Sequence, residues 1–159
     1  MKKPMLALSA ILLVSFGALT AQVHDGQITD DPLIGTWNIS GINNGSPGIA
    51  VTTFNAGGTT VEFDSGPTVP TAAETIALGK WYKSAEPLKY TFSEQNYIYE
   101  PSGNLAGDVV TSCSLTLASN HNSFTEDSCT YRLYACDMAE CPGALIGIES
   151  SGTAKGKRF

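Results

Sequence analysis

The sequence predicts an all-β protein whose strands form an eight-stranded antiparallel up-and-down barrel. Short alternating runs rich in Thr, Val, Ile, Tyr and Phe recur along the chain, and turns containing Gly, Asn, Ser and Pro separate them. A tryptophan, Trp37, lies on the first run and a cation, Arg158, lies on the last. These two side chains meet only if the sheet between them closes, so the pattern favours a barrel.

Eight runs fit strands in order along the chain. They cover residues 33–42, 49–54, 59–64, 78–84, 88–94 with a continuation to 99, 105–117, 123–135 and 145–158. Short turns rich in Asn and Gly join several of them, which predicts that consecutive strands are antiparallel neighbours. The longer link 65–77 contains two prolines. We expect a short helical turn near residues 72–76 of this link, capping one end of the barrel.

Alternation along the first and last strands predicts which side chains face inward. Trp37 shares its face with Leu33, Gly35 and Ile39. The inward set of the last strand is apolar or small until its final member: Ile146, Ile148, Ser150, Gly152, Ala154, Gly156 and Arg158. An inward guanidinium is costly unless it is paired, and an indole face is a suitable partner. We therefore expect Arg158 to lie across Trp37 as a latch, the alternative being a frayed, solvated C-terminal residue.

Another irregularity is expected in the strand that begins at residue 88. Tyr97 and Tyr99 have the opposite parity to Tyr90 and Phe92. A β-bulge near residues 95–96 would restore a common face, and it would expose an aromatic patch at the rim of the barrel.

Four cysteines in an exported chain predict two disulfides, for which three connectivities exist. A hairpin that turns on His121 places Cys113 opposite Cys129, close enough for a cross-strand disulfide. Cys136 and Cys141 would then clamp the acidic connection between them. Because the cysteine spacings fit no compact zinc motif, we expect no metal site.

The beginning of the chain has the features of a secretory signal peptide over residues 1–21. Two lysines precede a short apolar run at 6–16, and residues 19–21 fit a cleavage site. A membrane-spanning helix needs about 20 apolar residues, and this segment is interrupted by Ser, Gly and Thr. Residues 22–32 show no apolar period and are expected to form a flexible leader before a single barrel domain at 33–159. We expect a secreted or periplasmic protein with no membrane insertion after signal removal.

Removal of the signal peptide leaves an acidic chain. It keeps seven basic and 15 acidic side chains, a formal charge of −8. A negative surface disfavours adsorption to phosphate backbones, and no basic stripe interleaved with aromatic residues is present. The composition therefore predicts no nucleic-acid partner.

Several segments together resemble the lipocalins and the wider calycin superfamily, and most closely the exported lipocalin-like proteins of bacteria. They are Gly35-Thr36-Trp37, Thr53-Phe54-Asn55-Ala56-Gly57-Gly58-Thr59, Gly79-Lys80-Trp81, Pro101-Ser102-Gly103-Asn104-Leu105 and Gly152-Thr153-Ala154-Lys155-Gly156-Lys157-Arg158. The resemblance covers about 125 residues in order. It implies an eight-stranded barrel that binds a small apolar or amphipathic molecule without enzymatic activity.

The candidate ligand-binding residues are aromatic side chains expected inside the barrel. They are Phe54, Phe63, Trp81, Tyr90, Phe92 and Tyr131. The alternative is that these aromatic side chains form a packed core with no room for a guest. Trp81 has no predicted cation partner, unlike Trp37, so it is the tryptophan expected to meet a guest.

Residues for catalysis are scarce. His24 lies in the leader and His121 at a hairpin tip, so neither is placed to activate a nucleophile, and we expect no catalytic residue and no cofactor. Asp127 has the same parity as Cys129 and Tyr131, which makes it a candidate buried acid. The alternative is that the register slips near the turn and Asp127 faces water.

Three functions follow from these observations. The first is a non-enzymatic carrier of a small hydrophobic molecule. The second is an envelope or secreted protein-binding module of the inhibitor type, which contacts a protein partner through loops held by disulfides. The third is a barrel cyclase or isomerase that uses one buried acid.

Overall fold

The structure is a computed structural model that describes residues 29–43, 46–64, 73–136, 139–151 and 154–159. The predicted signal peptide and most of the predicted leader lie outside these residues. The described strands are β1 (Gly35–Asn43), β2 (Ser46–Phe54), β3 (Thr59–Asp64), β4 (Ala73–Glu74), β5 (Ala77–Lys83), β6 (Lys89–Tyr99), β7 (Leu105–Leu117), β8 (Ser123–Ala135), β9 (Leu145–Ser151) and β10 (Ala154–Arg158).

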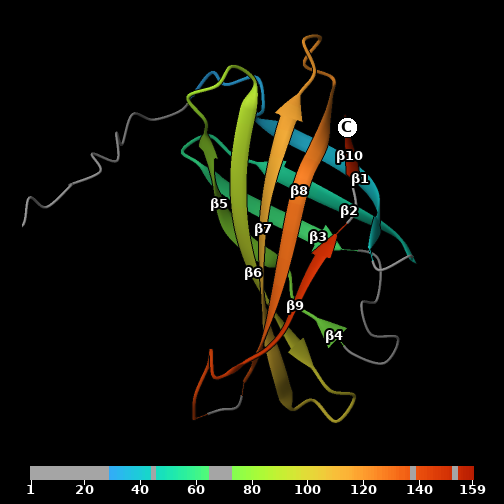
Figure 1. Cartoon of the computed structure of the whole chain (residues 1–159), viewed down its shortest axis with the longest axis vertical. Helices are drawn as coiled ribbons and strands as arrows, with labels where there is room; N and C mark the ends of the chain where they lie inside the picture. Colours follow the sequence, from blue (N-terminus) through green and yellow to red (C-terminus); the bar gives the residue numbers. More distant parts are fainter. Residues whose placement is uncertain (1–28, 44–45, 65–72, 137–138, 152–153) are drawn as a thin grey trace, which may run out of the picture.

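The predicted fold class is confirmed, because the described strands close into an eight-stranded antiparallel barrel (Figure 1). The neighbours run β10-β1-β2-β3-β5-β6-β7-β8, and β10 pairs with β8 to complete the ring. The last predicted strand is divided into β9 and β10, which keep one register along β8, since Ser151 pairs with Cys129 and Lys155 with Thr125. Each connection within the ring thus joins adjacent antiparallel strands.

The helical turn expected near residues 72–76 is wrong. Ala73 and Glu74 form the two-residue strand β4 instead, paired with Tyr99 and Ile98 of β6. The backbone N–H of Thr75 also donates to the Tyr97 carbonyl oxygen at 3.0 Å. This part of β6 extends past the end of β5, so its edge groups need partners, and the end of the link supplies them.

The β-bulge expected near residues 95–96 is also misplaced. The register between β6 and β7 shifts at Ile98 and Tyr99, where Ala106 is the additional residue on β7. Upstream of it the alternation of β6 is unbroken, with Tyr90, Phe92 and Glu94 buried.

The long strands β6, β7 and β8 extend beyond the barrel, where β4 and β9 flank them (Figure 1). In this extension β9 is an edge strand. Ile146 and Ile148 were expected to face the barrel interior, but they are 59% and 61% exposed. The inward assignment fails for them because this part of the last strand pairs with the portion of β8 outside the ring.

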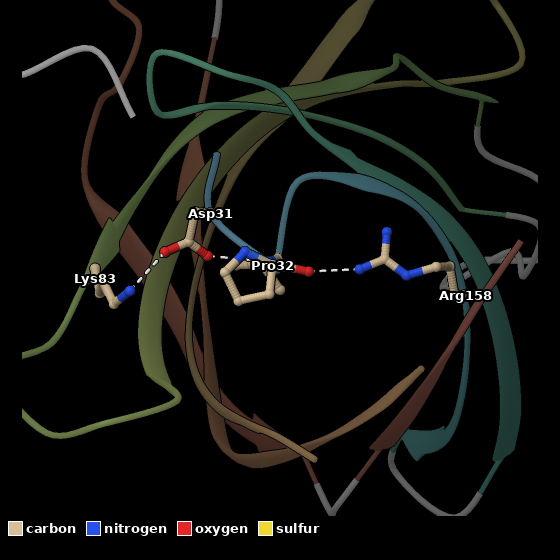
Figure 2. Close-up of polar contacts among 5 residues, drawn as sticks. Asp31, Pro32, Lys83 and Arg158 are labelled. Carbon is tan, nitrogen blue, oxygen red and sulfur yellow. Dashed lines mark hydrogen bonds and ion pairs between the residues drawn. The ribbon is translucent and has the colours of Figure 1, made fainter. Parts of the chain in front are cut away.

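One end of the barrel, which we call the latch end, is crossed by the chain that enters β1 (Figure 2). The Asp31 carboxylate accepts from Lys83 Nζ of β5 at 2.8 Å, and the Pro32 carbonyl accepts from the Arg158 guanidinium of β10. Burial works to raise the pKa of Asp31, but hydrogen bonds from Lys83 and from the Leu33 N–H outweigh it, so the pKa is lowered. This segment therefore ties opposite walls of the barrel together.

Arg158 makes the contact expected of the latch. It pairs with Trp37 across the two strands, and its guanidinium carbon lies 4.3 Å from the centroid of the indole ring. The guanidinium also donates to the carbonyl oxygens of Ile34 at 2.9 Å and His121 at 3.1 Å. Arg158 is thus held on several sides, and the alternative of a frayed residue does not hold.

Both glycines of the Gly-x-Trp segments are required by close approaches of other groups. Gly35 has a φ of 140°, and a Cβ at this position would collide with the guanidinium of Arg158. A Cβ on Gly79 would overlap the carbonyl oxygen of Ser93 on β6. The indoles of Trp37 and Trp81 each donate to a backbone carbonyl oxygen at 2.9 Å. These contacts give both segments a structural role in the barrel wall.

Candidate functional site

The predicted ligand-binding aromatics divide into three groups. Phe54, Trp81 and Tyr90 are 1% exposed and pack edge to face in the core of the latch end, with Phe54 and Trp81 centroids 6.3 Å apart. Phe63 is 58% exposed on the outer face, because Thr60 and Glu62 take the inward positions of β3. Phe92 and Tyr131 line a cavity. Trp81 is a core residue and does not line that cavity, so the expectation that it meets a guest is not supported.

The cavity has a volume of about 70 Å³ and lies at the other end of the barrel, which we call the acidic end. Its lining combines apolar, aromatic and acidic side chains from several strands: Ile39, Gly41, Gly48, Ile49, Ala50, Glu62, Asp64, Phe92, Thr111, Cys113, Glu126, Tyr131 and Ala154. Ile49 is 57% exposed, so the lining reaches the surface. Pockets for drug-sized ligands have about 300–1,000 Å³, so this cavity fits a very small molecule or the end of a larger one.

Glu62, on β3, is one of three glutamates that face the interior at this end. Its carboxylate accepts a hydrogen bond from the hydroxyl of Thr52 on the neighbouring strand β2. Burial raises the pKa of Glu62, the Thr52 hydrogen bond opposes that shift, and the charge of Asp64 adds to it.

Glu94, on β6, has the smallest exposed fraction of the three, 2%. Its carboxylate lies beside the Thr60 hydroxyl, which favours the ionised form. Burial, and next the charge of Glu62, raise the pKa of Glu94 to about 8. Its face of β6 also carries Phe92, and its cross-strand partner is Thr111, both of which line the cavity.

Glu126 takes the interior position that was considered for Asp127. A bulge at Ser114 and Leu115 pairs Ser128 with Ser114 and Glu126 with Leu115, which leaves Asp127 as the additional residue. Glu126 is 5% exposed, whereas Asp127 lies on the outside and accepts from the Thr116 hydroxyl at 2.7 Å. Burial, and next the charge of Glu62, raise the pKa of Glu126 to about 7.

None of these three glutamates was singled out from the sequence. Alternation carried a usable signal for Glu94, since it has the parity of Tyr90 and Phe92. For Glu62 it pointed the other way, because Phe63, which has the opposite parity, was expected inside the barrel. The position of Glu126 depends on a bulge that no turn or composition signal marks. The interior position of these glutamates is therefore determined by how the strands pair in the folded chain.

Both expected disulfides are present, Cys113–Cys129 and Cys136–Cys141. The first crosses β7 and β8 in register at the cavity wall, and Oε2 of Glu126 lies 3.2 Å from Sγ of Cys129. Within the described residues, the two groups of potential metal ligands each consist of one of these disulfides and one carboxylate. Disulfide sulfurs carry no thiolate to donate to a metal ion.

A second concavity lies outside the barrel. It measures about 360 Å³ and lies over the outer faces of β5 to β8. Its lining is rich in hydroxyl groups: Tyr82, Thr91, Ser93, Ser112, Ser114 and Ser128. Several of these hydroxyls already pair with each other, as Ser114 does with Ser128 at 2.9 Å. The interior cavity is therefore the better candidate for a binding site.

Fold and site define a class: a closed eight-stranded antiparallel barrel with two disulfides and an interior acidic cavity. When the chain is compared with protein-family models, with curated proteins and with solved structures, no match is found. Among the described residues, no helix has the length and apolar character to cross a membrane. The two disulfides indicate an oxidising environment.

Proposed function

We propose that this chain is an exported, non-enzymatic carrier barrel, related to the lipocalin-like proteins, that binds a small amphipathic molecule at its acidic end. The observation that carries the proposal is the interior cavity, whose walls are both apolar and acidic. Ile39, Ala50 and Ala154 supply contact for an apolar body, and Glu62 and Glu126 supply polar partners. A secreted or periplasmic location agrees with the two disulfides and with the predicted signal peptide.

The size of the cavity bounds the guest. About 70 Å³ does not accommodate a fatty-acid chain, a retinoid or haem as a whole. We expect a molecule of a few heavy atoms, or a longer one of which only one end enters.

The test is binding by NMR, with backbone amide resonances of the ¹⁵N-labelled mature chain followed during titration. Short alcohols, amines and carboxylates form the panel. We expect saturable shifts at Ala50, Thr111 and Ala154, which line the cavity, and none at Trp81 or Tyr90, which belong to the latch-end core. If no compound of the panel produces saturable shifts at either group of residues, the carrier function is refuted.

A protein-binding module is a second candidate, favoured by the extension outside the barrel. There β9 offers an edge strand, and Ile146 and Ile148 are more than half exposed beside the Cys136–Cys141 clamp. Capture of an envelope protein that is lost in Ile148→Lys and in Cys136→Ser would support this function. Capture indifferent to both substitutions would argue against it.

The cyclase or isomerase hypothesis loses the residue on which it depended. Asp127 is exposed and hydrogen-bonded to Thr116, outside the barrel.

A further inference from the structure

The two disulfides differ in how well a thiol from solution can reach them. Cys113–Cys129 joins two strands of the barrel wall, and its cysteines are 5% and 3% exposed. Cys136–Cys141 closes a loop between β8 and β9, where Cys136 is buried and Cys141 is exposed. Thiol–disulfide exchange begins when a thiolate attacks one sulfur of the disulfide, so the attacked cysteine must be accessible. Of the four cysteines, only Cys141 is exposed.

The loop that Cys136–Cys141 closes is also held by main-chain hydrogen bonds. The Ala135 N–H donates to the Ala144 carbonyl oxygen at 2.9 Å, and the Gly143 N–H donates to the Ala135 carbonyl oxygen at 2.8 Å. A disulfide between residues five positions apart restricts the unfolded chain less than one between residues 16 apart. Because hydrogen bonds already join the ends of the loop, this disulfide can open while the barrel stays folded.

Asp108, on β7, is a buried acid beside this disulfide. It is 0% exposed, and its parity differs from that of Thr111, so it lies on the face of the sheet opposite to the cavity. One of its carboxylate oxygens lies within 4.8 Å of the Sγ atoms of both Cys136 and Cys141. The Gln95 amide donates to Oδ2 at 2.9 Å, whereas Oδ1 has no hydrogen-bond partner among the described residues. Buried polar atoms are nearly always paired, so Oδ1 marks a place where a donor is missing.

Reduction of the disulfide supplies that donor. A disulfide sulfur carries no hydrogen, whereas a reduced cysteine has an S–H group that donates a hydrogen bond. Cys136 is 8% exposed and lies next to Asp108, so its S–H would be held at Oδ1. A buried acceptor that gains its hydrogen bond only in the dithiol stabilises the dithiol relative to the disulfide.

A carboxylate next to a disulfide does not by itself make an exchange site. Glu126 lies beside Cys113–Cys129 in a similar way, with Oε2 3.2 Å from Sγ of Cys129. Both of those cysteines are buried, and they pair directly across β7 and β8. Only Cys136–Cys141 combines a buried acid with an exposed cysteine.

We propose that Cys136–Cys141 is a thiol–disulfide exchange site whose substrate is a pair of thiols. A substrate thiol releases its proton to water, and the thiolate attacks Sγ of Cys141, which breaks the bond to Cys136. Cys136 leaves as a thiolate, takes a proton from water and donates the resulting S–H to Oδ1 of Asp108. A disulfide now joins the substrate to Cys141. This inference goes beyond the carrier function and does not depend on it.

The second substrate thiol completes the exchange. It releases its proton to water and attacks the substrate sulfur bound to Cys141, which forms the substrate disulfide. Cys141 leaves as a thiolate and takes a proton from water. Two electrons pass from the substrate thiols to the cysteine pair, and the two protons that the thiols release are matched by two that the cysteines take up. The reduced pair returns to the disulfide by the same steps in reverse, with a substrate disulfide as the oxidant.

The first experiment identifies which disulfide exchanges and which sulfur is attacked. The mature, oxidised chain is equilibrated under native conditions in graded glutathione redox buffers, quenched with acid, alkylated and analysed by peptide mass spectrometry. We expect Cys136 and Cys141 to be reduced in buffers that leave Cys113–Cys129 intact, with the glutathione adduct on Cys141 in about tenfold excess over Cys136. Reduction of both disulfides in the same buffers, reduction of neither, or an adduct mainly on Cys136 would overturn the proposal.

The second experiment tests Asp108 by the equilibrium constant for reduction of Cys136–Cys141. Asp108→Asn keeps one oxygen for the Gln95 amide but replaces the acceptor at Oδ1 with an NH₂ group. We expect the constant to fall about tenfold, which lowers the midpoint potential by about 30 mV for a two-electron couple. The matched control, Asp127→Asn, makes the same change on an exposed side chain and should alter the constant less than about twofold. Equal shifts in the two variants would overturn the pairing of Cys136 with Asp108. If Asp108→Asn does not fold by circular dichroism, the site of attack in the unsubstituted chain decides.

Small thiols and a peptide with two cysteines offer the same chemistry, and their rates separate them. Dithiothreitol and a short unstructured peptide with two reduced cysteines are compared at equal thiolate concentration. Reduction of Cys136–Cys141 that is about tenfold faster with the peptide supports the proposal with a peptide substrate, and equal rates support it with small thiols. Reduction by neither would overturn it. None of these measurements involves the interior cavity, so the exchange site and the carrier function stand or fall separately.

Discussion

Because of the buried glutamates, we expect the free energy of unfolding to fall as the pH rises from 5 to 8. Glu94 and Glu126 have pKa values of about 8 and about 7 in the folded chain, against 4.5 for an ordinary glutamate. Between those values the folded state binds protons that the unfolded state has already released. The free energy of unfolding is therefore highest below about pH 4.5 as far as these groups are concerned, and it decreases as pH rises through the folded pKa values.

The magnitude follows from the number of protons. One proton bound only in the folded state changes the free energy of unfolding by about 1.4 kcal/mol per pH unit. Glu94 and Glu126 together give a slope of at most about 2.7 kcal/mol per unit between pH 5 and 7. Because the interior glutamates interact, we expect a smaller total, on the order of 2–4 kcal/mol from pH 5 to 7. That is a large part of the roughly 5–15 kcal/mol by which domains are stable.

The assay is urea denaturation of the mature chain at pH 5, 6, 7 and 8, followed by tryptophan fluorescence, with the slope m compared at each pH. Glu126→Gln removes one ionisable interior group and should flatten the profile and raise stability at pH 8. Asp127→Asn removes one charge outside the barrel and controls for general repulsion on an acidic chain. A flat or rising profile between pH 5 and 7, or equal effects of the two substitutions, would refute the reasoning.

Two further predictions concern Arg158 at the latch end and Gly79, where the backbone of β6 comes close to β5. Arg158→Ala should lower the free energy of unfolding by about 2–4 kcal/mol, because it removes the contact with Trp37 and several charged hydrogen bonds. Arg158→Lys should recover less than half of this loss. A loss below about 0.5 kcal/mol, measured by urea denaturation, would contradict the latch. Gly79→Ala should lower the free energy of unfolding by about 2 kcal/mol or more, because its Cβ overlaps the Ser93 carbonyl oxygen. Gly48→Ala, with no atom within 4 Å of its Cβ, should change the free energy of unfolding by no more than about 0.5 kcal/mol. Equal melting temperatures for the two variants would argue against the close approach at Gly79.

Strand positions were predictable because alternation and turn chemistry act locally. The strands at 59–64, 105–117 and 123–135 have the expected bounds, and Cys113 pairs with Cys129 as expected. The pairing of Trp37 with Arg158 was also predictable, since it requires only the parity of two strands and the closure of the sheet. These features depend on period-two alternation, which the sequence carries directly.

Several of the failures share one physical cause, which is that bulges and edges are set by tertiary pairing. The bulge opposite Leu115 reverses the parity of β8 at Asp127, so Glu126 faces the interior with Cys129. β4 forms because β6 is longer than β5, so its presence depends on the relative lengths of two strands. Neither feature is indicated by the amino-acid sequence at the residues where it occurs.

The two ends of the barrel differ in how their buried polar and charged groups are paired. At the latch end Lys83 pairs with Asp31, and Arg158 donates to carbonyl oxygens and covers Trp37. At the acidic end Glu94 and Glu126 are buried, and none of the described residues that line the cavity is a cation. A buried carboxyl without a partner destabilises the fold once it ionises, so the aromatic core of the latch end must offset that cost.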